Sequence, residues 1–220
     1  ATAQDHKRAY DDDKGPNTGG MGVYSPVPFV TNEELSQMIA IEQRVVDQLK
    51  KEGINYSGCL YGGFMLTKDG PKVLEFNARF GDPETQVVLP RLQGDLVSIL
   101  MACDNGTLRH QQVSWSDTVA VSVVLASAGY PGSYEKGKEI IGIEAAQQLE
   151  GVSVYHAGTA QTENGKIVTA GGRVLNVTAL APTFEEARAR AYEACDLINF
   201  EGKQLRHDIG LKALQGRPEK

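Results

Sequence analysis

The most informative stretch of the sequence spans residues 74–84 and reads Leu74-Glu75-Phe76-Asn77-Ala78-Arg79-Phe80-Gly81-Asp82-Pro83-Glu84. Its first four residues alternate apolar and polar side chains, which is typical of a strand with one polar face. Residues two apart on a strand share a face at about 7 Å, so Glu75 and Asn77 lie together, and Arg79 joins them if the strand continues. Carboxylate and amide oxygens are hard ligands that suit Mg²⁺, and a guanidinium can bind a carboxylate or phosphate through two hydrogen bonds. The spacing alone leaves two interpretations open: a metal-binding strand, or an ordinary strand with a solvated polar face.

The residues before this strand predict a helix and a hairpin. Thr31 and Glu34 form the pattern of a capping box ahead of an apolar stripe that ends at Gly53, which predicts an amphipathic helix. Residues 57–67 and 72–77 flank the turn signal Asp69-Gly70, so we expect two antiparallel strands there. Asp82-Pro83 predicts the N-cap and first residue of the next helix, and a further helix is expected over 95–104.

The second half of the chain has a different character. Strands are predicted over 118–128, 139–143, 152–160, 166–170 and 173–180,. One helix follows Thr183, with Ala187, Ala191, Ala194 and Ile198 expected to face inward,. The change near residue 117 predicts a boundary between two domains, 1–117 and 118–220. The polar tail 215–220 is expected to be loose.

A glycine-rich segment near the start is the second candidate site. Residues 1–30 are dense in turn-forming residues, which predicts ordered turns or a mobile loop. Within them the segment 15–22 reads Gly15, Pro16, Asn17, Thr18, Gly19, Gly20, Met21 and Gly22. Its backbone N–H groups could converge on an anion, or it could be a plain connector; it has neither the Walker A nor the G-x-G-x-x-G pattern. Asp5 and Lys7 lie just upstream, in a charged run that could equally be a solvated face.

Composition narrows the class of protein. The 220 residues carry 22 Lys and Arg against 28 Asp and Glu, a net charge of −6, which argues against a general nucleic-acid binder. No apolar run approaches the roughly 20 residues that span a bilayer, so no membrane partner is expected. Cys59, Cys103 and Cys195 form no C-x-x-C pair, so we expect free thiols, as in the cytoplasm.

Taken together, these motifs resemble one family. Gln4-Asp5-His6-Lys7-Arg8, the segment from Gly15 to Gly22, Tyr24-Ser25-Pro26 and the stretch from Leu74 to Gln86 occur in the order seen in the phosphoribosylamine–glycine ligases, which are ATP-grasp enzymes of purine biosynthesis. The later segments 128–132, 156–159 and 171–175 resemble the carboxy-terminal domain of that family. The resemblance implies an α+β fold: the carboxy-terminal part of an ATP-grasp domain, residues 1–117, followed by a small β-rich domain, residues 118–220.

The resemblance also implies an activity and a set of site residues. The family joins glycine to 5-phosphoribosylamine, with ATP as co-substrate and a glycyl phosphate as intermediate. Carried onto this chain, Glu75 and Asn77 become ligands of Mg²⁺ or Mn²⁺, and Arg79 and Asp5 orient glycine. Lys7 and the segment 15–22 would lie near phosphoribosylamine, and Leu74 and Met65 would form an apolar floor under adenine. The family's members are about twice this length, so the missing amino-terminal half is an expected partner.

Two other functions remain open from the sequence. The chain could come from another ATP-grasp carboxylate–amine ligase that shares the Glu75-x-Asn77 strand. It could also be a non-catalytic fragment, or a subunit that needs a second chain, because it begins Ala-Thr-Ala-Gln without an initiator Met. We expect the isolated chain to be inactive and to bind ATP weakly, because the resemblance implies that it contains only one wall of an ATP-grasp cleft.

Overall fold

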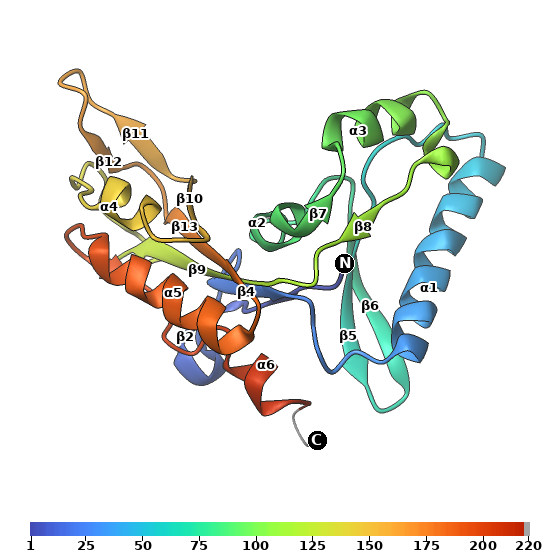
Figure 1. Ribbon diagram of the computed structural model, residues 1–220, viewed down its shortest axis with the longest axis horizontal. Helices are drawn as coiled ribbons and strands as arrows, with labels where there is room; N and C mark the ends of the chain where they lie inside the picture. The colour runs from blue at the N-terminus through green and yellow to red at the C-terminus, as the bar shows by residue number, and fades with distance from the viewer. Residues whose placement is uncertain (218–220) are drawn as a thin grey trace. The chain divides into compact units, whose positions relative to one another are not determined.

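The structure is a computed structural model that describes residues 1–217, and it contains two compact units. The first unit combines residues 1–28, 82–91 and 115–220, and the second combines 29–81 and 92–114. Figure 1 shows both units in the ribbon. These units group segments by packing, whereas the expected boundary near residue 117 divides the chain by sequence. That boundary therefore stays a prediction.

An antiparallel sheet forms the first unit. Its strands run in the order β1 (Gln4–Asp5), β4 (Gly22–Ser25), β9 (Val119–Ser127), β13 (Arg173–Ala181) and β10 (Val152–His156), and β14 (Lys203–Gln204) also pairs with β9. All nine residues of β9 are buried, which explains why its sequence is mostly apolar, without regular alternation of apolar and polar residues. The sheet thus brings residues from the start of the chain into one core with residues from its end.

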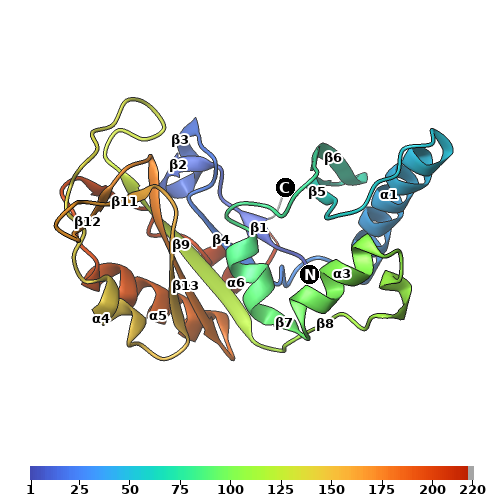
Figure 2. The same cartoon turned by 90° about the horizontal axis from the view of Figure 1, so that it is seen from above.

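Helices cover this sheet. The long helix α5 (Phe184–Leu197) contacts β9 and β13 (Figure 2), and the short helix α2 (Thr85–Val88) contacts β4, β9 and β13. Thr183 caps α5 by accepting a hydrogen bond from the N–H of Glu186, and the predicted inward residues Ala187, Ala191, Ala194 and Ile198 are fully buried. The remaining elements of the unit are α4 (Ile143–Gln147), α6 (Leu211–Gln215), the 3₁₀ turns η1 (Asp11–Asp13) and η2 (Leu89–Arg91), and the hairpins β2 (Arg8–Tyr10) with β3 (Lys14–Asn17) and β11 (Thr159–Gln161) with β12 (Ile167–Thr169).

The second unit contains a helix and a hairpin. Helix α1 (Asn32–Lys51) begins with the predicted capping box between Thr31 and Glu34 and contacts β5 (Tyr61–Thr67) and β6 (Gly70–Asn77). None of its residues is fully buried, so its apolar stripe packs only partly. Helix α3 (Leu96–Asp104), capped by Asp95, and the 3₁₀ turn η3 (Leu108–His110) complete the unit. Strand β7 (Leu92–Gln93) pairs with β8 (Ser114–Trp115) where the chain leaves it.

Several local predictions are wrong. The helix predicted to begin at Asp82-Pro83 has its N-cap at Glu84 instead of Asp82, because the Asp82 side chain is engaged by Arg173 and Gln86. The predicted strand 139–143 is two isolated bridges, at Glu139 and Ile141, and Ile143 already begins α4. The predicted strand 152–160 is two strands, β10 and β11. Residues 1–30 contain the ordered turn η1 and also four strands that the prediction of turns or a mobile loop missed. The expected loose tail lies partly outside the described residues, at 218–220.

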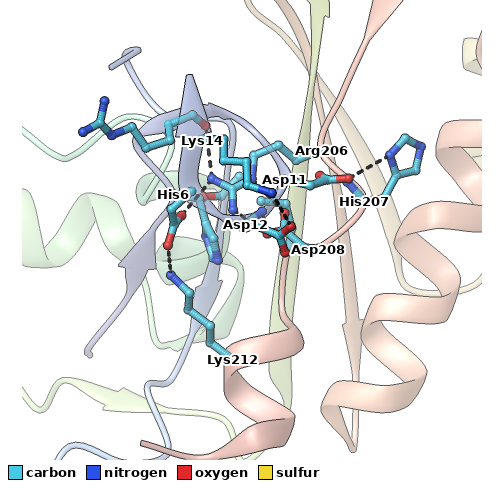
Figure 3. Close-up of polar contacts among 12 residues, drawn as sticks. His6, Asp11, Asp12, Lys14, Arg206, His207, Asp208 and Lys212 are labelled. Atoms are coloured by element: carbon cyan, nitrogen blue, oxygen red, sulfur yellow. Dashed lines mark hydrogen bonds and ion pairs between the residues drawn. The ribbon is translucent and has the colours of Figure 1, made fainter. Parts of the chain in front are cut away.

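A cluster of charged groups, which we call the Arg206 cluster, joins the two ends of the first unit (Figure 3). The Arg206 side chain is fully buried, and its guanidinium donates to Asp13 and Asp208 and to the carbonyl of Arg8. Although burial opposes the charge, hydrogen bonds from Arg206 and from the N–H of Asp12 lower the pKa of Asp208 to about 2. Lys212 pairs with Asp13, and the N–H of His207 donates to Asp11 at 2.7 Å. The turn η1 is therefore held by residues about 200 positions later in the chain.

Candidate active site

The expected site residues fall in both units, and each unit is described by itself. The first unit contains Asp5, Lys7 and the segment 15–22. The second contains Glu75, Asn77, Arg79, Leu74 and Met65.

In the first unit, Asp5 is a buried carboxylate in close contact with a glycine. It lies on β1 opposite Val23, its side chain is 7% exposed, and it forms an ion pair with Lys7. Its Oδ1 has no hydrogen-bond partner among the described residues. A Cβ on Gly20 would lie 2.6 Å from this Oδ1 and 2.5 Å from Cδ of Pro83, and Gly20 has a φ of +122°. Only glycine fits this contact, so the backbone of residue 20 packs directly against the Asp5 carboxylate. The Oδ1 atom of Asp5 remains able to accept a hydrogen bond from a ligand.

The charge state of Asp5 follows from its surroundings. Burial, reinforced by the nearby Glu84 and opposed by Lys7, raises the pKa of Asp5 to about 6. The neighbouring His6 is also buried, and its Nδ1 lies 3.2 Å from the carbonyl of Gly22. Burial, together with the charges of Arg206 and Lys212, lowers the pKa of His6 to about 4. At neutral pH the site therefore presents an ionised carboxylate beside a neutral imidazole.

These two shifts have opposite effects on stability. Asp5 binds its proton more tightly when folded, so its contribution is complete below pH 3.8 and is lost as the pH rises through about 6,. His6 binds its proton less tightly when folded, so its contribution is complete above pH 6.5 and is lost as the pH falls to about 4,. We expect Asp5→Asn to be more stable than the parent at neutral pH, by up to about 3 kcal/mol, and to gain stability as the pH rises from about 4 to about 6.5, because His6 then acts alone.

Thermal melting of both proteins over that pH range measures this effect. Asp196→Asn, at an exposed position on α5, is the matched control and should run parallel to the parent at every pH. An Asp5→Asn curve that also runs parallel to the parent would show that Asp5 has an ordinary pKa.

The segment 15–22 is more ordered than the sequence suggests. Residues 15–17 belong to β3 and Gly22 begins β4, so only residues 18–21 connect strands. The N–H groups of these four residues are already bonded: Thr18 to the carbonyl of Lys7, Gly19 to the hydroxyl of Tyr130, Gly20 to Oγ1 of Thr18, and Met21 to the carbonyl of His6. Internal acceptors therefore use these four N–H groups, which favours an ordinary connector over an anion-binding turn at residues 18–21.

Two residues from the second half of the chain contact this segment, and neither was predicted as a site residue. The hydroxyl of Tyr130 accepts the N–H of Gly19 at 2.9 Å. Arg173 donates through Nη1 to the carbonyl of Gly19 at 3.0 Å and through Nη2 to Oδ2 of Asp82 at 2.8 Å. Both residues lie in segments, 128–132 and 171–175, whose resemblance to the family was visible, but their partners are more than 90 positions away and only the fold reveals them.

In the second unit, β6 positions the candidate metal ligands. Glu75 lies opposite Gly63 and Asn77 opposite Tyr61, with regular pairing between them, so the two oxygen-bearing side chains share a face of the hairpin. The pairing shifts between Gly63 and Phe64, which face Glu75 and Val73 respectively, so Leu74 is the extra residue of a bulge. One carboxylate and one amide oxygen fit Mg²⁺, which keeps waters and substrate oxygens in its remaining positions. Among residues 1–217 there is no group of three His, Cys, Asp or Glu side chains that could hold a metal ion.

The other expected residues of this unit are more dispersed. Strand β6 ends at Asn77, so the expectation that Arg79 continues its polar face is wrong. The Arg79 guanidinium instead donates to the carbonyl of Phe80 at 3.0 Å, and Asp82 is braced by Arg173 in the first unit. Met65 and Leu74 are 53% and 64% exposed. Their side chains form exposed apolar surface on the hairpin, and apolar surface is what typically lines the binding site of a planar base.

Comparisons with known proteins identify the family of the chain. Residues 1–85 match the ATP-grasp (A) domain of phosphoribosylglycinamide synthetase, and residues 120–212 match its C domain. A phosphoribosylamine–glycine ligase of Caldanaerobacter subterraneus is 51% identical over 94% of this chain, and the match covers 49% of that protein. The trifunctional purine biosynthetic protein adenosine-3 of Gallus gallus is 52% identical over 96% of this chain and 21% of its own length.

A solved structure agrees with these matches. The crystal structure of phosphoribosylamine–glycine ligase from Thermotoga maritima has a TM-score of 0.82 and 39% identity, covering 94% of this chain and 50% of that one. A biotin carboxylase domain with a TM-score of 0.59 and 18% identity shares the fold. The chain spans about half the length of the single-activity relatives it matches. The α+β assignment is confirmed, and the chain belongs to the phosphoribosylglycinamide synthetase family, from within the ATP-grasp domain to the C domain.

Proposed function

We propose that the complete protein ligates glycine to 5-phosphoribosylamine at the expense of ATP, giving glycinamide ribonucleotide, ADP and phosphate. The observation that carries the proposal is the 51% identity, over 94% of this chain, to a protein named phosphoribosylamine–glycine ligase. The paired oxygens of Glu75 and Asn77 and the buried carboxylate of Asp5 supply chemistry that such a ligation requires. The proposed domain division stays near residue 117, between the two family matches.

Glu75 and Asn77 are the proposed holders of Mg²⁺ or Mn²⁺. Bound there, the metal would neutralise charge on the phosphate oxygens of ATP during phosphoryl transfer. Met65 and Leu74 would contact the adenine ring through their exposed apolar side chains. These roles place recognition of ATP on the hairpin of the second unit.

Asp5 and Arg79 are the proposed glycine residues. Asp5 would accept hydrogen bonds from the glycine ammonium through Oδ1, which has no partner of its own among the described residues. Because its pKa is about 6, Asp5 is mainly ionised at neutral pH and can pair with a cation. Arg79 would bind the glycine carboxylate before that carboxylate attacks the γ-phosphate. Lys7 and the segment 15–22 would face phosphoribosylamine, whose amine then displaces phosphate from the glycyl carbonyl.

Arg79→Lys tests the glycine assignment. Lysine keeps the charge but cannot form two parallel N–H bonds to a carboxylate, so we expect kcat/KM for glycine to fall by about one to two orders of magnitude. The half-saturating ATP concentration should stay within a few-fold. Steady-state kinetics and a melting curve on the same variant decide the matter. A lower melting temperature with unchanged glycine dependence would remove Arg79 from the site.

The proposed activity is tested by measuring ADP release from the complete protein. Release should require both glycine and phosphoribosylamine. Another ATP-grasp ligase would release ADP with a different carboxylate or amine and ignore glycine. The isolated 220-residue chain, run in parallel, should show no glycine-dependent turnover, and measurable turnover by it would show that the missing half is not required.

We propose a cytoplasmic location for the reaction. The three cysteines are free thiols, which suits a reducing compartment. No helix among the described residues has the length and apolar character needed to cross a membrane. The proposed partners are the small molecules of the reaction and the amino-terminal half of the enzyme.

A further inference from the structure

We infer that Arg173 and Tyr130 are positioning residues for the amine substrate, acting through the backbone of Gly19. The inference rests on the proposed function, because it assumes that the segment 15–22 faces phosphoribosylamine. All of the contacts that carry it lie within the first unit. We call the two residues and their contacts with Gly19 the Gly19 clamp.

Tyr130 holds one side of Gly19. Its hydroxyl accepts the Gly19 N–H at 2.9 Å, and its ring lies directly over Gly172, where an added Cβ would come within 2.2 Å of Cδ2 of the ring. Ser127 holds the backbone of Gly172 and of its neighbour Gly171, because its N–H donates to the carbonyl of Gly172 and its hydroxyl to the carbonyl of Gly171. Gly172 is thus needed so that the tyrosine can pack against the backbone and reach the segment.

Arg173 holds the other side. Its Nη1 donates to the carbonyls of Gly19, at 3.0 Å, and Asp82, at 3.1 Å, while Nη2 donates to Oδ2 of Asp82 at 2.8 Å. The pairing of β13 with β9 shifts between Arg173 and Leu175, and such a bulge re-aims the side chains beside it. The Arg173 guanidinium therefore links the segment 18–21 to Asp82, the residue before Pro83.

The clamp determines the wall beside Asp5. Gly20, which follows the clamped residue, is packed against both Asp5 and Pro83, and Pro83 follows the clamped Asp82. Since the N–H groups of residues 18–21 are all bonded internally, this segment can serve as a fixed wall but not as an adaptable anion cradle. Loosening the clamp should let Gly20 move relative to Asp5, while the hairpin proposed to bind ATP makes none of these contacts.

Two variants of the complete protein test the inference. For Arg173→Lys we expect KM for phosphoribosylamine to rise about tenfold or more, because a charge-assisted hydrogen bond is lost. For Tyr130→Phe we expect roughly a fivefold rise from the loss of one neutral hydrogen bond. KM for ATP should stay within about twofold. Amide hydrogen exchange across residues 18–21, measured by mass spectrometry, should become faster in both variants, since opening of the segment becomes easier.

The controls are substitutions of the same kind elsewhere in the first unit. Arg190→Lys alters an arginine whose guanidinium faces the carbonyls of Glu150 and Leu180, and Tyr155→Phe alters a tyrosine on β10 opposite Asn176. Neither should change exchange at 18–21 or KM for phosphoribosylamine.

Each outcome decides a separate point. Unchanged exchange at 18–21 in Arg173→Lys overturns the clamp. Faster exchange with an unchanged KM for phosphoribosylamine, or an equal rise in KM for ATP, overturns the positioning role. A parent enzyme that needs neither glycine nor phosphoribosylamine overturns the proposed function, and the positioning role with it, whereas the exchange data still report whether the clamp holds the segment.

Discussion

Glu75→Gln in the complete enzyme is expected to lower kcat by about 100-fold or more and to raise the Mg²⁺ concentration needed for half-maximal rate. The amide has nearly the shape of the carboxylate but lacks the charge that a hard cation prefers. Charge stabilisation by a bound metal contributes several kcal/mol to phosphoryl transfer, and each 1.36 kcal/mol corresponds to about a tenfold change in rate. ADP release measured over a Mg²⁺ titration gives both quantities.

Stability should change little in this variant, because Glu75 is an exposed residue of β6. Glu52→Gln is the matched control: it removes a carboxylate at the C-cap of α1, where negative charge is not favoured by the helix dipole. Its kinetics should match those of the parent. Normal activity of Glu75→Gln at low Mg²⁺ would assign the metal to other residues.

Arg206→Leu is expected to destabilise the chain by about 3 kcal/mol or more, because removing one partner of a buried ion pair leaves its counter-charges without compensation. Arg206 is fully buried, whereas the side chains of Asp208 and Asp13 are 18% and 43% exposed. Water can therefore hydrate the two carboxylates in the variant, which keeps the loss of stability near the lower end of the range for buried ion pairs. The loss should also spread to η1, which Arg206, Lys212 and Asp208 hold in place. Urea unfolding of the 220-residue chain measures the change as a shift in midpoint.

Lys138→Leu provides the comparison for this variant. Lys138 also forms two ion pairs, with Glu135 and Glu201, but its carboxylate partners are exposed, so its loss should be much smaller. The double variant Arg206→Leu with Asp208→Asn should recover part of the stability, because one uncompensated charge is removed. Equal losses for Arg206→Leu and Lys138→Leu would show that burial of the Arg206 cluster is energetically unimportant.

Local signals in the sequence predicted those elements that depend on local interactions. The capping box of α1, the Asp69-Gly70 hairpin, the helix expected over 95–104 and the inward alanines of α5 all depend on residues a few positions apart, and the structure contains them. Strand β4 was missed because it spans only Gly22–Ser25 between turn-forming residues, and its identity comes from pairing with β9, almost 100 positions later. Tertiary pairing outweighs local propensity there.

The candidate site shows the same division. Glu75 and Asn77 were predicted from their spacing on one strand, and the register of the hairpin places them on one face. Arg79 was expected beside them because the strand was assumed to continue, but it ends at Asn77. The contacts of Arg173 with Gly19 and Asp82 join residues 154 and 91 positions apart, so no local pattern could have predicted them. The burial that shifts the pKa values of Asp5 and His6 is likewise a property of the folded unit.

The most direct test of the proposed ligation follows the oxygen of glycine. When the complete enzyme acts on glycine labelled with ¹⁸O in its carboxylate, attack of that carboxylate on the γ-phosphate forms a P–O bond to a labelled oxygen. Attack by the amine of phosphoribosylamine then breaks the C–O bond and releases phosphate with that oxygen. The proposed ligation predicts one ¹⁸O atom in each phosphate formed, as measured by mass spectrometry. Phosphate without label, with both labelled oxygens retained in glycine or released to water, would contradict it.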